Sequence, residues 1–220
     1  MNAAIFLDYL GVTLFAATGA LAASRRQLDI VGFVFFAALT GTGGGTVRDL
    51  ILDVPVFWLV QPIHILICAG AAVVVFFTAH LLESRYRWLL WLDAVALAAY
   101  AVFGAYKGLA VTGSPVLAVV MGMLTAALGG VLRDMVAGEP SVLMRREVYI
   151  FAAMAGATVF VLARMAEAPL LLASLAGFAV GFGVRGGALW FGWRLPIYKS
   201  LPGRSQQDSL DGVPREEAGR

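Results

Sequence analysis

Charged residues are scarce in this chain. Only 14% of its 220 residues are charged, whereas 60% are hydrophobic. Water-soluble domains are about one quarter charged and one half apolar, so this composition excludes a soluble globular protein. Intrinsic disorder is excluded by the same figures, because disordered chains are poor in apolar residues and rich in net charge. The composition therefore indicates a polytopic membrane protein.

The chain also has almost no cysteine and only a small net charge. Cys68 is the single cysteine, which excludes a disulfide framework and a cysteine-based zinc site. The net charge is only +2, with no dense basic cluster, so nucleic acid is not expected as a partner. His64 and His80 are too far apart on one expected helix to share a metal ion. The spans contain no Ser-His-Asp constellation, so we expect no enzyme activity, no cofactor and no bound metal.

Long apolar stretches follow one another along the chain. A bilayer core about 30 Å thick needs roughly 20 mostly apolar residues per helix. The segments that satisfy this are 3–23, 30–54, 62–82, 88–106, 115–138, 148–163 and 169–191. The sixth is short, but flanking charged side chains can snorkel and lengthen it. The predicted fold class is an all-α polytopic membrane protein with seven transmembrane helices.

Basic residues in the loops predict the orientation of these spans. The loops after the first, third and fifth spans lie on the same side as the C-terminal tail, and they contain Arg25, Arg26, Arg85, Arg87, Arg145 and Arg146. The opposite side has Lys107 and Arg164. We therefore expect the N-terminus outside and the C-terminus in the cytoplasm. Residues 196–220 are polar and are expected to form a disordered tail.

The chain contains an internal repeat with an offset of 85 residues. In this register Asp8 aligns with Asp93, and the aligned motifs are Gly44-Gly45 with Gly129-Gly130 and Arg48-Asp49 with Arg133-Asp134. The predicted division is a first three-helix repeat (1–85), a second repeat (86–168), a seventh helix (169–195) and the tail (196–220). Three spans are an odd number, so the second repeat enters the membrane with inverted topology, as in many transporters and channels.

Glycine clusters lie near the middle of the second and fifth spans: Gly43, Gly44 and Gly45 in one, and Gly129 and Gly130 in the other. Glycine costs about 1 kcal/mol relative to alanine in a helix interior, so a break or kink is expected at these positions. A broken helix in a membrane needs protein or a water-filled cavity to satisfy the freed backbone groups. Close helix packing on small residues is the alternative explanation.

An Arg-Asp pair follows each glycine cluster: Arg48-Asp49 and Arg133-Asp134. Ionisable residues inside a membrane usually face a bundle interior or an aqueous path. Adjacent residues do not face each other on a helix, so each Arg and its Asp are expected to have separate partners. The alternative is that the helices end at the glycines and that these charges are interfacial loop residues.

Three further charges are candidate site residues. Asp8 and Asp93 lie a turn or so inside the first and fourth spans, where either helix capping or a pore-mouth role would explain them. Lys107 is expected to end the fourth span, and its repeat partner is Ala22, so it breaks the symmetry. It is either a snorkelling anchor or a gating or charge-selecting cation near an entrance. The third and sixth spans carry the fewest polar side chains and are expected to act as scaffold.

At the motifs GTGGGTVRD and LGGVLRD, the sequence resembles the bacterial branch of the trimeric intracellular cation channel family, some of whose members carry a glycine-transporter label. The resemblance implies a homotrimer in a bacterial inner membrane, with a potassium pore in each subunit lined chiefly by the first, second, fourth and fifth spans. Animal members have a lysine just before the second glycine pair, linked to lipid binding. Ala127 and Leu128 precede that pair here, so phosphoinositide regulation is not carried over.

Three functions remain open from the sequence. The first is a passive, potassium-permeable cation channel, with potassium as the permeant ion and membrane lipids and other copies of the chain as its partners. The second is a secondary transporter of a small zwitterion such as glycine, because broken helices in an inverted repeat can hold carboxylate and ammonium groups. The third is a structural protein whose glycines only pack helices.

Overall fold

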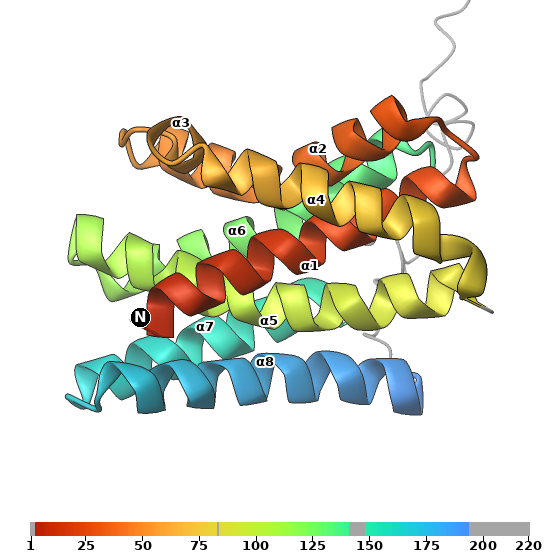
Figure 1. Cartoon of the computed structure of the whole chain (residues 1–220). Helices are drawn as coiled ribbons and strands as arrows, with labels where there is room; N and C mark the ends of the chain where they lie inside the picture. The colour runs from red at the N-terminus through yellow and green to blue at the C-terminus, as the bar shows by residue number, and fades with distance from the viewer. Residues whose placement is uncertain (1–2, 83, 141–147, 194–220) are drawn as a thin grey trace, which may run out of the picture.

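Long helices make up most of residues 3–82, 84–140 and 148–193, the part of the chain that the computed structural model describes (Figure 1). Side chains are described from residue 6 onward. In these ranges the helices are α1 (Ala3–Arg25), α2 (Ile30–Ile51), α3 (Phe57–Val60), α4 (Ile63–Thr78), the 3-10 helix η1 (Ala79–Leu81), α5 (Arg85–Thr112), α6 (Pro115–Val136), α7 (Tyr149–Met165) and α8 (Leu170–Phe191). The expected tail, 196–220, lies outside the described residues.

Six of these helices are long and apolar enough to cross a membrane: α1, α2, α4 with η1, α5, α6 and α8. The remaining expected span is the sixth, 148–163, which corresponds to α7 with its 17 residues. The prediction of an all-helical membrane protein is confirmed. The short helix α3 was not expected. Lys107 does not end its helix, because α5 continues to Thr112 and stops at Gly113, which adopts a left-handed conformation with φ of 66°.

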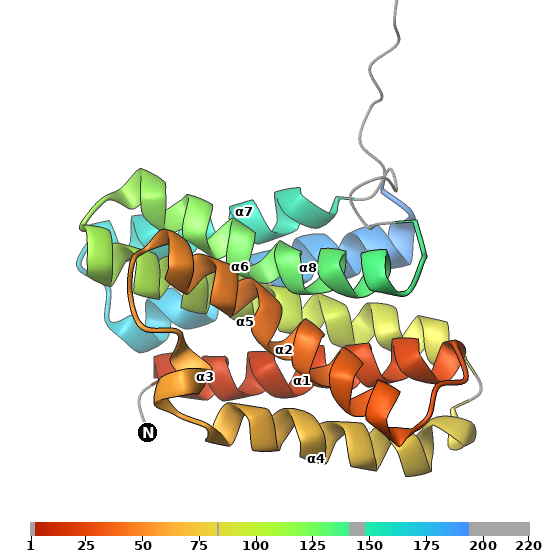
Figure 2. The ribbon, with the colours of Figure 1, turned by 90° about the horizontal axis from the view of Figure 1, so that it is seen from above.

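The two repeats lie side by side and run in opposite directions (Figures 1 and 2). The helix α1 packs against α5, and α2 packs against α6. Even the helix ends correspond: Asp53 after α2 and Gly138 after α6 are one repeat apart and have φ values of 53° and 63°. The helix α8 packs beside α5 and α7, outside the repeated part. This arrangement brings equivalent residues of the two repeats to opposite halves of the bundle.

The glycine clusters allow the repeats to approach closely. The helices α2 and α6 are continuous through their glycines, so a break is excluded, and the kink expected at these positions stays a prediction. A Cβ added to Gly129 would lie only 2.6 Å from the carbonyl oxygen of Thr40, and one added to Gly44 would collide with that of Thr125. The two helices therefore cross with backbone against backbone, which is the small-residue packing considered as the alternative.

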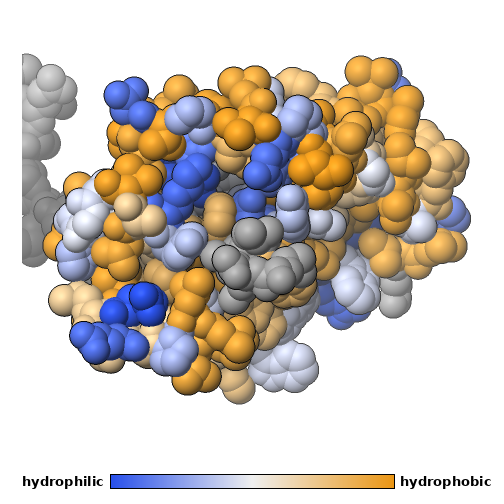
Figure 3. Space-filling view, turned by 60° about the vertical axis from the view of Figure 1, so that its left-hand side comes forward, coloured by the Kyte–Doolittle hydropathy of each residue, from blue (hydrophilic) through white to orange (hydrophobic). Residues whose placement is uncertain are grey.

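Apolar side chains cover much of the surface, as expected for a membrane protein. Figure 3 shows one face, on which hydrophilic residues are grouped among apolar ones. Large exposed side chains include Val31, Phe77, Trp190 and Phe191. Buried charge, in contrast, includes the side chains of Arg48, Asp49, Asp93, Arg133, Asp134 and Arg185. This arrangement, with apolar side chains outside and charged side chains inside, is the reverse of that in a soluble protein. It places the charged side chains within the bundle.

Candidate functional site

Two groups of buried polar side chains occupy the two halves of the bundle. The first cluster consists of Asp8, Arg48, Asp49, His64 and Lys107. The second cluster consists of Asp93, Arg133, Asp134 and Tyr149. Four of the positions in each cluster are related by the 85-residue repeat, and Lys107 has no charged counterpart. The charged groups come mainly from α1, α2, α5 and α6, with one ring each from α4 and α7.

The first cluster is centred on Asp49, whose side chain is fully buried. Its Oδ1 atom accepts a hydrogen bond from Arg48 Nε at 2.8 Å and forms an ion pair with Lys107 Nζ at 2.8 Å. Its Oδ2 atom accepts a hydrogen bond from the Phe57 backbone N–H at 2.9 Å, which fixes the start of α3. The Arg48 guanidinium also lies over the rings of Phe57 and Phe103, at 5.8 and 5.1 Å from their centroids. The contacts of Arg48 and Asp49 therefore join α2, α3 and α5.

The second cluster is centred on Arg133. Its Nε atom donates to Asp134 Oδ1 at 2.9 Å, and its Nη1 atom donates to Asp93 Oδ1 at 2.7 Å and to Thr18 Oγ1 at 3.1 Å. The side chains of Arg133 and Asp93 are each 1% exposed. This network joins α6 to both α1 and α5. In hydrocarbon, such charges are tolerated because they neutralise one another.

The prediction that each Arg and its neighbouring Asp have separate partners is wrong. In both pairs the arginine side chain folds back along the helix and its Nε atom reaches the next residue's carboxylate. Additional partners on α5 are present, since Asp49 binds Lys107 and Arg133 binds Asp93. The alternative that these pairs lie in loops is also wrong, because all four residues are helical and buried.

Helix capping does not account for Asp8 and Asp93, because neither lies in the first turn of its helix. Asp8 Oδ2 instead pairs with His64 Nε2 of α4 at 2.9 Å. Lys107 is not only an interfacial anchor, since its ammonium reaches the buried Asp49.

The sequence analysis missed two ring residues that belong to these clusters. His64 lies on α4 and is the repeat equivalent of Tyr149 on α7. The Tyr149 hydroxyl and Asp93 Oδ1 both face Gly130, where an added Cβ would lie 2.6 and 3.4 Å from them. The third helix of each repeat is thus part of the polar site, so its expected role as scaffold alone is wrong. The alignment of two polar rings within apolar helices was a signal that could have identified them.

Arg185 on α8 was also missed. Its side chain is fully buried, and its guanidinium lies 5.0 Å from the centroid of the Tyr149 ring. The helix outside the repeat therefore contacts the second cluster through an aromatic ring. This contact gives α8 a defined place in the polar interior.

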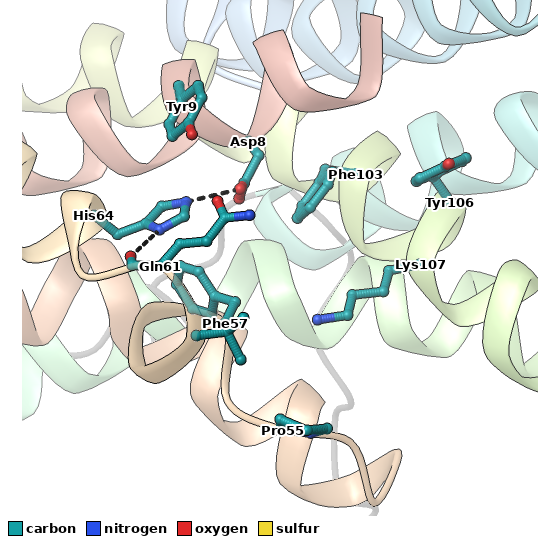
Figure 4. A pocket seen from close by; sticks show the side chains of 10 residues that line it. Asp8, Tyr9, Pro55, Phe57, Gln61, His64, Phe103, Tyr106 and Lys107 are labelled. Atoms are coloured by element: carbon teal, nitrogen blue, oxygen red, sulfur yellow. Dashed lines mark hydrogen bonds and ion pairs between the residues drawn. The ribbon is translucent and has the colours of Figure 1, made fainter. Parts of the chain in front are cut away.

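A cavity of about 400 Å³ opens onto the first cluster. Figure 4 shows Asp8, His64 and Lys107 around it, with His64 bonded to both Asp8 and Gln61 and with Lys107 extending from α5 into the same space. Aromatic side chains complete the lining: Tyr9, Phe57, Phe103 and Tyr106. A second cavity, of about 460 Å³, lies at the other end of the bundle and is lined by Arg25, Arg26, Tyr86 and Glu139 among others. Cavities that are bordered by charged side chains therefore lie at both ends of the bundle.

Gly43 and Gly45, the remaining glycines of the motifs, contact side chains that adjoin the clusters. An added Cβ at Gly45 would lie 2.6 Å from the Phe57 ring, and one at Gly43 would lie 2.7 Å from Leu132. Within the described residues, no group of three His, Cys, Asp or Glu side chains could hold a metal ion.

An inverted three-helix repeat enclosing paired buried charges defines the class of membrane transport proteins. The family described as glycine transporter matches the chain twice, at residues 5–80 and 90–165, in the 85-residue register found in the sequence. A trimeric intracellular cation (TRIC) channel orthologue from Rhodobacter sphaeroides has 50% identity and a TM-score of 0.85, covering 88% of this chain and 100% of that chain. The chain belongs to this family of TRIC cation channels.

Two other relatives agree with this assignment. The UPF0126 inner membrane protein YadS of Escherichia coli is 32% identical over 88% of this chain and 95% of its own length. A structure described as the basis for conductance through TRIC cation channels is 28% identical, with a TM-score of 0.79, and covers 90% of this chain and 98% of that chain. The resemblance identified from the sequence motifs is confirmed. So is the prediction that the protein is not an enzyme, because the family is one of channels.

Proposed function

We propose that the protein is a passive, potassium-permeable cation channel that forms a homotrimer with one conduction path in each subunit, in the inner membrane of a bacterium. The observation that carries the proposal is the pair of buried charge clusters, one in each inverted repeat, between polar cavities at the two ends of the bundle. The 50% identity to a trimeric cation channel orthologue supports a cation as the permeant ion, the trimer and the passive mode. The name of the relative YadS supports the inner membrane.

The path runs along α1, α2, α5 and α6, whose polar residues face one another inside the subunit. We assign pore and gating roles to Asp8, Asp93, Lys107, the two Arg-Asp pairs and the glycines Gly43, Gly44, Gly45, Gly129 and Gly130. Arg48 and Arg133 do not exclude cations, because each is paired with the carboxylate beside it. The glycines set the width of the path, since they hold α2 and α6 in backbone contact where the repeats meet.

In the proposed orientation, the N-terminus lies outside. The cavity around Asp8 and Lys107 then faces the periplasm, and the cavity around Arg25 and Arg26 faces the cytoplasm. The positive-inside rule supports this, because Arg25 ends α1 and Arg26 begins the short loop that follows. The repeat units 1–85 and 86–168 then cross the membrane in opposite directions, and 169–195 supplies the helix outside the repeat.

The test is potassium release from liposomes that contain the purified protein and no amino acid. Wild-type protein is expected to collapse a potassium gradient rapidly and without saturation. The variant Lys107→Met removes the ammonium that lies 2.8 Å from Asp49, while Arg48 and the Phe57 N–H continue to hold that carboxylate. Loss of a positive charge at an entrance favours cation entry, so release is expected to become about threefold to tenfold faster. Unchanged release in a folded variant would remove Lys107 from the path.

The second candidate is a secondary transporter of a small zwitterion such as glycine. The cavity near Asp8 favours it, because it is lined by both a carboxylate and an ammonium group. A transporter predicts no potassium release in the experiment above, and saturable glycine uptake once an ion gradient is imposed. The matched pair Asp8→Asn and Lys107→Met would then raise the glycine concentration needed for half-maximal uptake.

A further inference from the structure

The hydrogen bonds of His64 require a proton that a neutral histidine does not have. Its Nδ1 atom lies 2.8 Å from the Gln61 carbonyl oxygen, and its Nε2 atom lies 2.9 Å from Asp8 Oδ2. A carbonyl and an ionised carboxylate can only accept hydrogen bonds, whereas a neutral imidazole has one donor nitrogen and one acceptor nitrogen. One of the two contacts would then place two acceptors face to face. Both are satisfied only when Asp8 and His64 together hold one additional proton.

We propose that the Asp8–His64 pair is a proton-binding site that sets the charge of this entrance and thereby controls how readily cations enter the path. The inference rests on the proposed channel function. It makes His64 a residue that determines specificity at the entrance through charge, with no direct role in holding the permeating ion. The ligand of the site is the proton itself, taken from the solution that fills the cavity.

The Asp8–His64 pair lies where a proton from solution can reach it and where its charge can act on an entering ion. His64 and Asp8 line the 400 Å³ cavity, and their side chains are 2% and 13% exposed. The ring of His64 is held by Tyr9, stacked at 5.2 Å, and by Phe57, edge-on at 4.8 Å. A rigid ring that touches the cavity can exchange a proton without leaving its place. The change in charge then occurs beside the route that an entering ion takes.

The groups that face His64 determine the sign of the effect. Asp8 and Tyr9 face it from α1, Lys107 lines the same cavity from α5, and Arg48 and Asp49 of α2 lie behind Phe57. With its proton, the Asp8–His64 pair is neutral, so the first cluster carries one net positive charge. Without the proton the pair is negative and the cluster is neutral. Loss of the proton therefore lowers the electrostatic barrier to cations, and potassium flux rises with pH.

The internal repeat provides a natural comparison. Tyr149 holds the position equivalent to His64 and faces Asp93 in the second cluster. A tyrosine hydroxyl ordinarily keeps its proton to about pH 10, whereas histidine ordinarily titrates near pH 6.5. Only the first cluster therefore changes its charge in the neutral range. The two halves of the path share one architecture but differ in their response to protons.

The first experiment measures potassium release from liposomes between about pH 5.5 and 8.5, a range that spans ordinary histidine titration. The parent is His80→Gln, because His80 is the other histidine in the chain and its side chain is exposed, on η1. Release is expected to rise about threefold to tenfold with pH in this parent. Adding His64→Tyr, which copies the second repeat, is expected to make release independent of pH. The same pH dependence in both proteins would overturn the proposal.

The second experiment observes the proton without relying on flux. In the His80→Gln protein His64 is the sole imidazole, so nitrogen NMR of 15N-labelled histidine reports its two ring nitrogens alone. Both nitrogens are expected to be protonated at the acidic end, with one proton lost within the range, and Asp8→Asn is expected to move that transition. A neutral single tautomer whose two nitrogen shifts do not change with pH would overturn the proposal, because the pair would then neither gain nor lose a proton. Absence of potassium flux with a normal NMR titration would instead contradict the proposed channel function and leave the proton site in place.

Discussion

Gly129 is the position where an added methyl group should be most informative. The substitution Gly129→Ala places a Cβ atom 2.6 Å from the Thr40 carbonyl oxygen of the facing helix α2. Ordinary contacts between carbon and carbonyl oxygen are about 3.3 Å or longer, so the helices must separate by about 0.7 Å. The atom that must move is backbone, and it belongs to a helix that also carries Arg48 and Asp49. Relief by a side-chain rotation is therefore excluded.

The magnitude follows from two opposing effects. Overpacking of a rigid contact costs about 1–3 kcal/mol. Alanine returns up to about 1 kcal/mol of helix propensity. A net loss of about 1–2 kcal/mol is expected, which lowers the melting temperature of a chain of this size by about 3–6 °C. Thermal unfolding is measured in detergent micelles, and the signal is the fraction of protein that remains monodisperse at each temperature.

Gly183→Ala is the matched control. Gly183 lies within α8, and an added Cβ there would have nothing within 4 Å. The free energy of unfolding of this variant should equal that of the wild type or exceed it by up to about 1 kcal/mol. If Gly129→Ala melted as high as Gly183→Ala, backbone contact between the repeats at the glycines would be refuted, and the packing explanation of the motif would fail with it.

Three further outcomes are expected. Arg133→Gln removes the partner of Asp93 and Asp134 and should lower the free energy of unfolding by about 3–5 kcal/mol. Adding Asp93→Asn should recover part of this loss. A double variant that is no more stable than Arg133→Gln would contradict the pairing. In a Cys68→Ala background, Gln61→Cys should react with an impermeant maleimide applied to intact cells from outside, and labelling only after lysis would reverse the proposed orientation. The purified protein should have the mass of a trimer by light scattering with detergent subtracted, and a monomer or dimer would contradict the proposed assembly.

The sequence was sufficient for the fold because the relevant signals are one-dimensional. Apolar length located the spans, and the 85-residue register identified the repeat before any contact was known. The ends were less predictable: Lys107 suggested a helix terminus, yet α5 continues past it because Asp49 of another helix neutralises the charge. A charged residue marks the membrane boundary only when no buried partner is available, and partners are a property of the tertiary structure.

The site was predictable in its residues and less so in its contacts. Arg48 and Arg133 were identified because ionisable residues are rare in apolar helices. Their pairing with the next residue was missed because the spacing rule for helix faces describes Cβ directions, whereas a long arginine side chain can fold back. His64 was set aside because it was considered only as a metal ligand, together with His80. Its contact with Asp8 joins α1 to α4, and no spacing within one helix could reveal it.

The unequal halves of the path have an electrical consequence. Lys107 in one repeat corresponds to Ala22 in the other, and His64 corresponds to Tyr149, so the backbone symmetry encloses an asymmetric distribution of charge. An ion that enters beside Lys107 meets its highest barrier early, whereas an ion travelling the other way meets it late. Under equal and opposite voltages the two currents then differ in size. In the proposed channel, the differences at Lys107 and His64 would therefore make the current depend on its direction, although the two repeats share one backbone arrangement.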